Sequence, residues 1–288
     1  MNWQAGRFCF DLQARPLVMG IVNVTPDSFS DGGQHFAHAD APIEHGERLL
    51  AEGADLLDIG GESTRPGALA VSADDEWQRI QRSVQHFVAR GVCVSVDTMK
   101  PEVMARALAA GADVINDVMG FRAPGAIEAV APSGCGLVVM HMQGEPRTMQ
   151  RNPTYRNVVA EVRAFLAERV MALRAAGIKD ERILLDPGFG FGKSLEHNLH
   201  LLAQIGQIRV PCESSSADLP VLAGVSRKSM LGQLTGRDAG ERVAASVAAH
   251  LLAVQRGARI VRVHDVAATV DALKVWAAVQ ARRCREED

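Results

Sequence analysis

The 288-residue sequence has no apolar run that approaches the roughly 18 residues of a membrane-spanning helix. Its first residues, MNWQAGRFCFDL, lack the basic start and following apolar run of a secretory signal. The net charge of −3 provides no basic surface of the kind that nucleic-acid binding requires. We therefore expect a cytoplasmic protein whose partners include neither a membrane nor a nucleic acid.

Cysteine is scarce, and the cysteines that occur are poorly spaced for a shared role. The five are Cys9, Cys93, Cys135, Cys212 and Cys284. An odd number without a CxxC pair argues against a disulfide framework and against a zinc site. We expect five reduced thiols, as is usual in the cytosol.

Common catalytic signatures are also missing. There is no nucleophile elbow and no HExxH motif. The string GFGFGKS at 188–194 resembles a phosphate loop, but Pro187 stands where its first glycine belongs and Lys193 replaces the last glycine of GxGxxG. We interpret this string as a loop that exposes Phe189 and Phe191, where Phe191 stacks on a ligand or one of the two phenylalanines packs in the core.

The sequence does contain a regular alternation of short β-branched apolar runs and longer helical segments. The predicted strands are Leu17–Val24, Asp55–Gly60, Val92–Asp97, Asp113–Asp117, Gly136–Met142, Arg182–Asp186, Pro220–Val225 and Arg259–Val263. The predicted helices are 40–52, 73–90, 101–110, 123–132, 155–177, 194–208, 237–256 and 265–283. The strands are apolar throughout, as parallel strands buried on both faces should be.

Eight such units predict an α/β protein with a single (β/α)₈ (TIM) barrel domain over residues 1–288. A doubly wound parallel sheet is the alternative fold. Residues 7–12 are expected to form a short extra strand at the N-terminus. The polar stretch 212–220 is interpreted as a surface insertion rather than a domain boundary.

Every predicted strand ends in polar residues, which would gather at the C-terminal rim where barrel enzymes place their chemistry. They are Asn23, Asp58 with Glu62, Asp97, Asn116 with Asp117, His141, Asp186, Arg227 with Lys228, and Arg262 with His264. Taken singly, Asp58 and Asp117 are typical turn formers and His141 a typical core histidine. Helix capping alone does not select Arg, Lys and His, so the whole set predicts a polar pocket.

The set divides by charge. Asp97, Asn116 and Asp186 come from the third, fourth and sixth predicted strands and suit a ligand rich in N–H donors. The cations follow the last two strands, where this fold often binds phosphate, and Arg65 adds to them. Residue types alone thus predict a pocket for a nitrogen heterocycle joined to an anion.

The strand ends also carry long motifs that resemble those of bacterial dihydropteroate synthase. The motifs are NVTPDSFSDGG (23–33), DIGGESTRPG (58–67), SVDT (95–98), IND (115–117), MHMQG (140–144), LLDPGFGFGK (184–193), SRKSM (226–230) and RVHDV (262–266). The resemblance extends from about residue 7 to residue 280. It departs at Ile208–Leu219, which is longer than usual and is expected to lie away from the pocket.

The resemblance implies a transferase that joins 6-hydroxymethyl-7,8-dihydropterin pyrophosphate to p-aminobenzoate, releasing pyrophosphate. It implies pterin binding by Asp97, Asn116, Asp186 and Lys228, and pyrophosphate binding by Thr64, Arg262, His264 and Asn23. It implies Mg²⁺ as cofactor on Asn23, and p-aminobenzoate binding by Phe29, Pro66, Phe191, Lys228 and Ser229. Catalytic roles fall to Asp97, Lys228, Asp31 and Arg65, and sulfonamides, which mimic p-aminobenzoate, are expected inhibitors.

Two other functions stay open at this point: a methyltetrahydrofolate-dependent methyltransferase barrel and a non-catalytic pterin-binding paralogue. The methyltransferase has no pyrophosphate to bind, so it gives the SRKSM and RVHDV cations no role. For assembly, the apolar segments 243–255 and 270–281 predict a homodimer. Small alanines on an exposed helix face are the other explanation of that composition.

Overall fold

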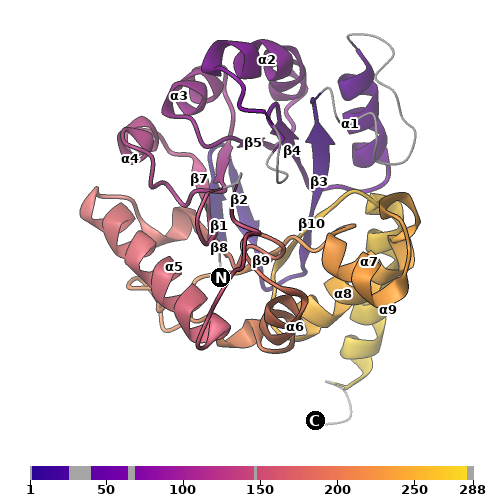
Figure 1. Ribbon diagram of the computed structural model, residues 1–288. Helices are drawn as coiled ribbons and strands as arrows, with labels where there is room; N and C mark the ends of the chain where they lie inside the picture. The colour runs from indigo at the N-terminus through magenta and orange to yellow at the C-terminus, as the bar shows by residue number, and fades with distance from the viewer. Residues whose placement is uncertain (1, 26–39, 64–68, 146–147, 284–288) are drawn as a thin grey trace.

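The computed structural model describes residues 2–25, 40–63, 69–145 and 148–283. Parallel strands form a ring at the centre, and helices surround them (Figure 1). The strands are β3 (Leu17–Asn23), β4 (Leu56–Gly60), β5 (Val94–Asp97), β6 (Val114–Asp117), β7 (Gly136–Met140), β8 (Ile183–Asp186), β9 (Leu222–Ala223) and β10 (Ile260–Val263). They are hydrogen-bonded in the order β8-β7-β6-β5-β4-β3-β10-β9, and a parallel bridge between Leu185 and Val221 joins β8 to β9. The predicted barrel is confirmed.

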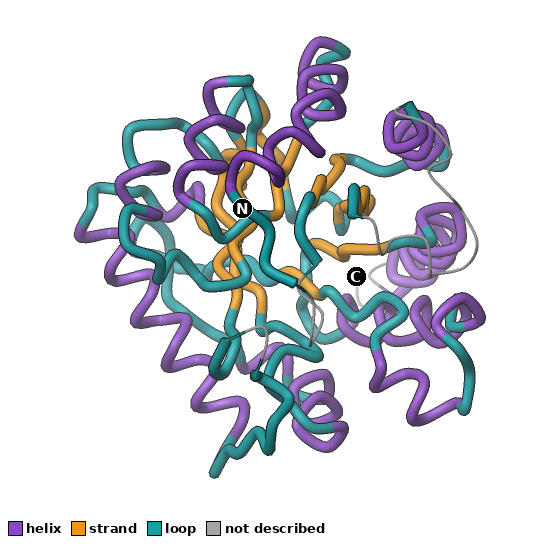
Figure 2. Tube along the Cα trace, turned by 45° about the horizontal axis from the view of Figure 1, so that its top comes forward, coloured by secondary structure: helices purple, strands orange, loops and turns teal. Residues whose placement is uncertain are grey.

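Helices enclose the strands, as Figure 2 also shows from a second direction. They are α1 (Ala41–Ala51), α2 (Ala73–Ala89), α3 (Pro101–Ala109), α4 (Ala126–Val130), α5 (Val158–Ala175), α6 (Leu195–Ala203), α7 (Ser229–Thr235), α8 (Val243–Gln255) and α9 (Val266–Arg283). Short 3₁₀ turns are η2 (Asp180–Arg182), η3 (Ile205–Gln207) and η4 (Ala239–Glu241). No described helix is both long and apolar enough to cross a bilayer.

The segment between β9 and β10 differs from the prediction of one helix over 237–256. It forms α7, the turn η4 and then α8, which begins only at Val243. Helix α7 is too short to show a helical period. It is capped by Gly236, whose φ of 70° is the left-handed conformation that commonly ends a helix.

A hairpin closes the N-terminal end of the barrel, where one extra strand was expected. Strands β1 (Asn2–Ala5) and β2 (Phe8–Asp11) pair antiparallel through a turn at Gly6. Trp3 is fully buried, and its Nε1 donates a 3.1 Å hydrogen bond to the carbonyl of Arg182. The hairpin packs on an apolar cluster from the strand starts that includes Leu56, Val114, Leu184 and Ile260.

Alternation along each strand determines what fills the barrel above this cluster. In β4, Leu56 belongs to the cluster under the hairpin, whereas Leu57 and Ile59 belong to the cluster shared with the helices. Because successive side chains alternate between faces, Asp58 points inward like Leu56. The same count places Ser95, Asn116, Asp186 and Arg262 inside, so the barrel interior changes from apolar at the N-terminal end to polar at the C-terminal end.

Candidate functional site

A cavity of about 530 Å³ opens at the C-terminal ends of the strands, where the polar strand ends were predicted to gather. Its lining includes seven of the predicted site residues: Asn23, Asp97, Phe191, Lys228, Ser229, Arg262 and His264. Glu62, Arg227 and Arg242 also line it. The structure therefore brings together residues from the ends of β3, β4, β5, β8, β9 and β10.

Asp58 lies at the centre of the buried network beneath this cavity. It is fully buried and accepts hydrogen bonds from Ser95 Oγ at 2.5 Å, Asn116 Nδ2 at 3.0 Å and Arg262 Nε at 2.6 Å. The turn-forming role considered for Asp58 is therefore wrong. Its inward position, two residues after Leu56, is the sequence signal that would have identified it.

Arg262 joins Asp58 to Asp97, because its Nη2 donates to Asp97 Oδ2 at 2.8 Å. Burial opposes the charge on Arg262, but the attraction of Asp58 and Asp97 prevails and raises its pKa. Burial raises the pKa of Asp97 to about 7, against the attraction of Arg262 and with the repulsion of Asp58. Asp97 is thus a carboxyl group that titrates near neutral pH.

Asn116 and Asp186 present acceptors at inward positions of β6 and β8, which are separated by β7. Among the described residues, Asn116 Oδ1 is buried and has no hydrogen-bond partner. Asp186 Oδ1 accepts from the Gly188 N–H at 2.7 Å, and burial raises the pKa of this carboxyl. A Cβ at Gly224 would lie 3.8 Å from Asp186 Oδ2 and 3.9 Å from Arg262 Cβ, so both side chains border the space above Gly224.

Lys228 stands between this acceptor group and an aromatic ring. Its Nζ donates to the Phe189 carbonyl and lies 4.3 Å from the centroid of the Phe191 ring. Burial lowers the pKa of Lys228 to about 8, although Asp186 favours the charged form. Phe189 is fully buried, so the expectation that the loop exposes it is wrong. Phe191 is partly buried and lines the cavity.

The chain around Lys228 is held from both sides. Arg227 has a φ of 54°, which is uncommon for a residue with a side chain, and its guanidinium pairs with Asp265. The carbonyl of Arg227 accepts from Arg242 Nη1 at 2.9 Å. Ser226 Oγ lies 2.9 Å from His264 Nδ1 and accepts from the His264 N–H. These contacts connect the loops after β9 and β10.

Two other strand-end residues have structural roles. Asp117 accepts from the N–H groups of Met119 and Phe121, as a turn former does. His141 is buried and lies 2.9 Å from Lys193 Nζ, as expected of a hydrogen-bonded core histidine.

Five of the predicted site residues lie outside the described residues: Phe29, Asp31, Thr64, Arg65 and Pro66. Thr25 and Ser63 are the last described residues before 26–39 and 64–68, and both line the cavity. Glu62 is fixed by Lys100 Nζ at 2.6 Å and by the Val71 N–H at 3.0 Å.

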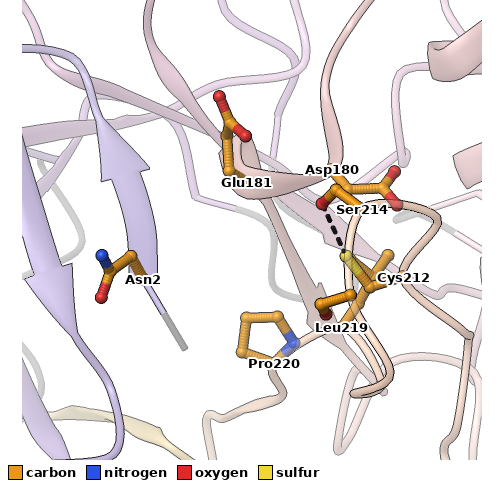
Figure 3. Close-up of a pocket in the computed structure, with 8 residues that line it drawn as sticks. Asn2, Asp180, Glu181, Cys212, Ser214, Leu219 and Pro220 are labelled. Carbon is orange, nitrogen blue, oxygen red and sulfur yellow. Dashed lines mark hydrogen bonds between the residues drawn. The ribbon is translucent and has the colours of Figure 1, made fainter.

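A second cavity, of about 330 Å³, lies beside the hairpin at the other end of the barrel (Figure 3). It is bordered by Asn2, Asp180 and the 208–219 segment, which is therefore far from the strand ends, as expected. Asp180 is engaged by Arg174 at 2.7 Å through both oxygens, and Cys212 Sγ contacts Ser214 Oγ at 3.2 Å. The polar groups here are used in holding the segment, so this cavity is the weaker candidate.

Comparisons with known proteins agree with this geometry. Residues 19–264 match the family model described as pterin binding enzyme. Dihydropteroate synthase of Neisseria meningitidis serogroup B is 51% identical over 96% of this chain and 97% of its own length.

Two solved structures are similar to the whole chain. Burkholderia cenocepacia dihydropteroate synthase complexed with 7,8-dihydropteroate is 54% identical with a TM-score of 0.91, over 99% of this chain and 98% of that one. The Xanthomonas albilineans synthase with 4-aminobenzoic acid is 57% identical with a TM-score of 0.85, over 95% and 96%. The chain belongs to the pterin binding enzyme family, in its dihydropteroate synthase branch.

Proposed function

We propose that this chain condenses 6-hydroxymethyl-7,8-dihydropterin pyrophosphate with p-aminobenzoate to form 7,8-dihydropteroate and pyrophosphate. The observation that supports it most directly is the buried Asn116 Oδ1, which has no partner among the described residues. A buried acceptor without a donor is costly, and a bound ligand with N–H groups would satisfy it. Similar proteins that bind dihydropteroate and 4-aminobenzoic acid support the same reaction.

The pterin is assigned to the inner end of the cavity. Asp97, Asn116 and Asp186 would accept from its N–H groups, and Lys228 would donate to its acceptors. Arg262 orients Asp58 and Asp97 through its Nε and Nη2. Its assignment to the pyrophosphate rests on the resemblance, and the geometry adds this orienting role.

The pyrophosphate is assigned to the cationic side of the cavity. Arg262 provides a cation there, His264 and Asn23 also line this side, and Thr64 is added on the resemblance. Cationic groups at a departing pyrophosphate stabilise the charge that develops as the bond to the pterin breaks. The carboxylates of Asp97 and Asp31 would stabilise the positive charge left on the pterin, with Lys228 and Arg65 completing the catalytic set.

The residues present fit Mg²⁺ bound mainly through the substrate. The described residues hold no group of three or more His, Cys, Asp or Glu side chains suited to a metal. Mg²⁺ commonly takes one or two protein oxygens together with phosphate oxygens and waters, and Asn23 at the cavity provides such an oxygen. When bound, the ion would neutralise charge on the pyrophosphate.

The p-aminobenzoate is assigned to the side formed by Phe191, Lys228 and Ser229. The Phe191 ring offers a flat face for the benzene ring, and the Lys228 amino group offers a cation beside it. Phe29 and Pro66 are added on the resemblance. Sulfonamides should compete for this position.

Binding selectivity separates this function from a methyltransferase. We expect calorimetry with Mg²⁺ to show the dihydropterin pyrophosphate binding at least about tenfold more tightly than 6-hydroxymethyl-dihydropterin, because the cationic side meets the pyrophosphate. Asn116→Ala should weaken both ligands by a similar factor, and Asn157→Ala, at the exposed start of α5, should change neither. Equal affinities for the two ligands would contradict the proposed reaction.

The remaining assignments concern the molecule as a whole. We propose a single domain over residues 1–288 and a cytoplasmic location, which the free thiols of Cys9, Cys93, Cys135 and Cys212 support.

We also propose a homodimer through α8 and α9. Leu252, Val275 and Val279 on these helices are exposed apolar side chains.

A further inference from the structure

Lys193 is a buried lysine that the proposed reaction does not use. Its side chain is 3% exposed, and its Nζ lies 2.9 Å from His141 Nδ1, 2.8 Å from the Gly188 carbonyl and 3.0 Å from the Phe191 carbonyl. No described carboxylate forms an ion pair with it. Burial of this amino group is costly and the attraction of Asp186 does not offset it, so its neighbours must compensate through hydrogen bonds.

These partners satisfy Lys193 whether or not it is charged. Burial lowers the pKa of Lys193 well below its ordinary value and lowers that of His141 to about 2, so His141 is neutral. A charged Nζ donates three hydrogen bonds, to His141 and the two carbonyls. A neutral Nζ donates to the carbonyls and accepts from a His141 Nδ1–H. The contacts therefore persist across the working pH range.

The loop that Lys193 holds has little stiffness of its own. Gly188, Gly190 and Gly192 have φ values of 69°, 76° and 62°, which glycine adopts without strain. The loop also packs closely, because a Cβ at Gly188 would lie 1.9 Å from the His141 carbonyl and one at Gly192 2.6 Å from the Gln143 carbonyl. A flexible glycine-rich backbone in a tight space needs fixed points, and Lys193 binds its first and fourth carbonyls together.

The same loop supplies two contacts to Lys228. The Phe189 carbonyl accepts from Lys228 Nζ, and the Phe191 ring lies beneath that nitrogen. We propose that Lys193 is a positioning residue, which holds the 188–193 loop so that Phe191 and Lys228 together form the p-aminobenzoate side of the cavity. The substrate named here rests on the proposed function, whereas the holding of the loop does not.

Kinetics test the positioning role with Lys193→Met, which keeps the length of the side chain. We expect the KM for p-aminobenzoate to rise at least about tenfold and the KM for the pterin pyrophosphate to rise by a smaller factor, because Asp186 and Lys228 contact this loop whereas Asp97 and Asn116 do not. Lys193→Gln, which retains a donor, should fall between. Lys179→Met removes a 77% exposed lysine beside η2 and should leave both constants unchanged. Equal rises in both KM values would overturn the proposal.

A double-mutant cycle tests whether Lys193 acts through Phe191. In a Phe191→Ala background, Lys193→Met should raise the KM for p-aminobenzoate by no more than about threefold, because the ring it positions is gone. A further rise as large as in the Phe191-containing protein would show that the two residues act independently and would overturn the proposal.

Hydrogen exchange tests the loop without any substrate. In the free protein, Lys193→Met should accelerate amide exchange over residues 187–193 and leave the β1–β2 hairpin unchanged. If the Met variant does not fold, Lys193→Gln serves for the same comparison. Unchanged exchange over 187–193 would overturn the proposal. If the variant exchanges faster but the unmutated protein makes no dihydropteroate, the loop depends on Lys193 and the proposed function is rejected instead.

Discussion

At the scale of single residues, Asp97 is the group on which the proposed chemistry depends most. Asp97→Asn keeps the size of the side chain but removes the carboxylate that faces Arg262 and the proposed pterin site. We expect kcat to fall about 100-fold or more, because charge placed where it develops in the transition state contributes about that much. Asp74→Asn, at an exposed position of α2, is the matched control. A near-normal kcat in the Asp97 variant would refute this role.

The pKa values of Asp97 and Lys228 predict the pH dependence of kcat/KM. Asp97 titrates at about 7 and is needed ionised, so activity should rise with pH through that value. Lys228 titrates at about 8 and is needed protonated, so activity should fall above it. In Asp97→Asn, kcat/KM should no longer rise with pH near 7 but should still fall above about pH 8. A rise that persists in this variant would mean that another group causes it.

The sequence predicts some of these residues better than others. Asp97, Asn116, Asp186 and Lys228 end strands and were found by position and type together. Asp58 belongs to the predicted polar set without a ligand role of its own, because an aspartate in such a position is usually a turn former. Only the alternation of side chains from Leu56 shows that it points into the barrel. The link from Arg262 to Asp58 and Asp97 spans more than 160 residues and follows from barrel closure, which no local pattern encodes.

At the scale of secondary-structure elements, α7 illustrates a conflict between local preference and a neighbouring contact. A Cβ at Gly232 would lie 2.2 Å from Arg242 Nη2, so Gly232→Ala must displace that guanidinium. Because alanine favours a helix by about 1 kcal/mol and an arginine head group moves readily, we expect thermal stability to be unchanged or slightly higher.

The same variant should still lose activity, because Arg242 Nη1 would no longer support the Arg227 carbonyl beside Lys228. We expect the KM for p-aminobenzoate to rise by about threefold to tenfold. Gly134→Ala, where an added Cβ meets nothing within 4 Å, is the control. Unaltered kinetics in Gly232→Ala would show that Arg242 does not support the site.

Long helices and buried strands are predicted well from the sequence. Helices such as α2 and α5 extend over many residues, and the central strands stand out as continuous apolar runs although most have four residues or fewer. Helix α7 and the β1–β2 hairpin are too short for a period. Helix α7 is held by its buried Met230 and Leu231, and the hairpin by the cluster of strand starts. Tertiary contacts therefore determine the elements that sequence patterns leave unresolved.

At the scale of the whole molecule, the hairpin stabilises the barrel at the end opposite the cavity. Trp3→Ala removes a fully buried ring from the cluster of strand starts. We expect the free energy of unfolding in urea to fall by about 3–5 kcal/mol. Pterin affinity in the folded fraction should be unchanged, and weaker binding would mean that the two ends of the barrel are coupled.

The proposed homodimer is a second property of the whole molecule. Sedimentation velocity at micromolar concentration should show a dimer, which Val275→Glu with Val279→Glu should convert to monomer by placing charges in an apolar contact. Met171→Glu, at an exposed apolar position on α5, should leave the dimer intact. A wild-type monomer at that concentration would rule out the dimer.

The most direct test of the proposed condensation is pyrophosphate release from purified protein, Mg²⁺, the dihydropterin pyrophosphate and p-aminobenzoate, with each component omitted in turn. The proposed function predicts release that matches dihydropteroate formation mole for mole and stops without p-aminobenzoate. Tight pterin binding with no pyrophosphate release in the complete mixture would contradict it and indicate a non-catalytic pterin-binding protein.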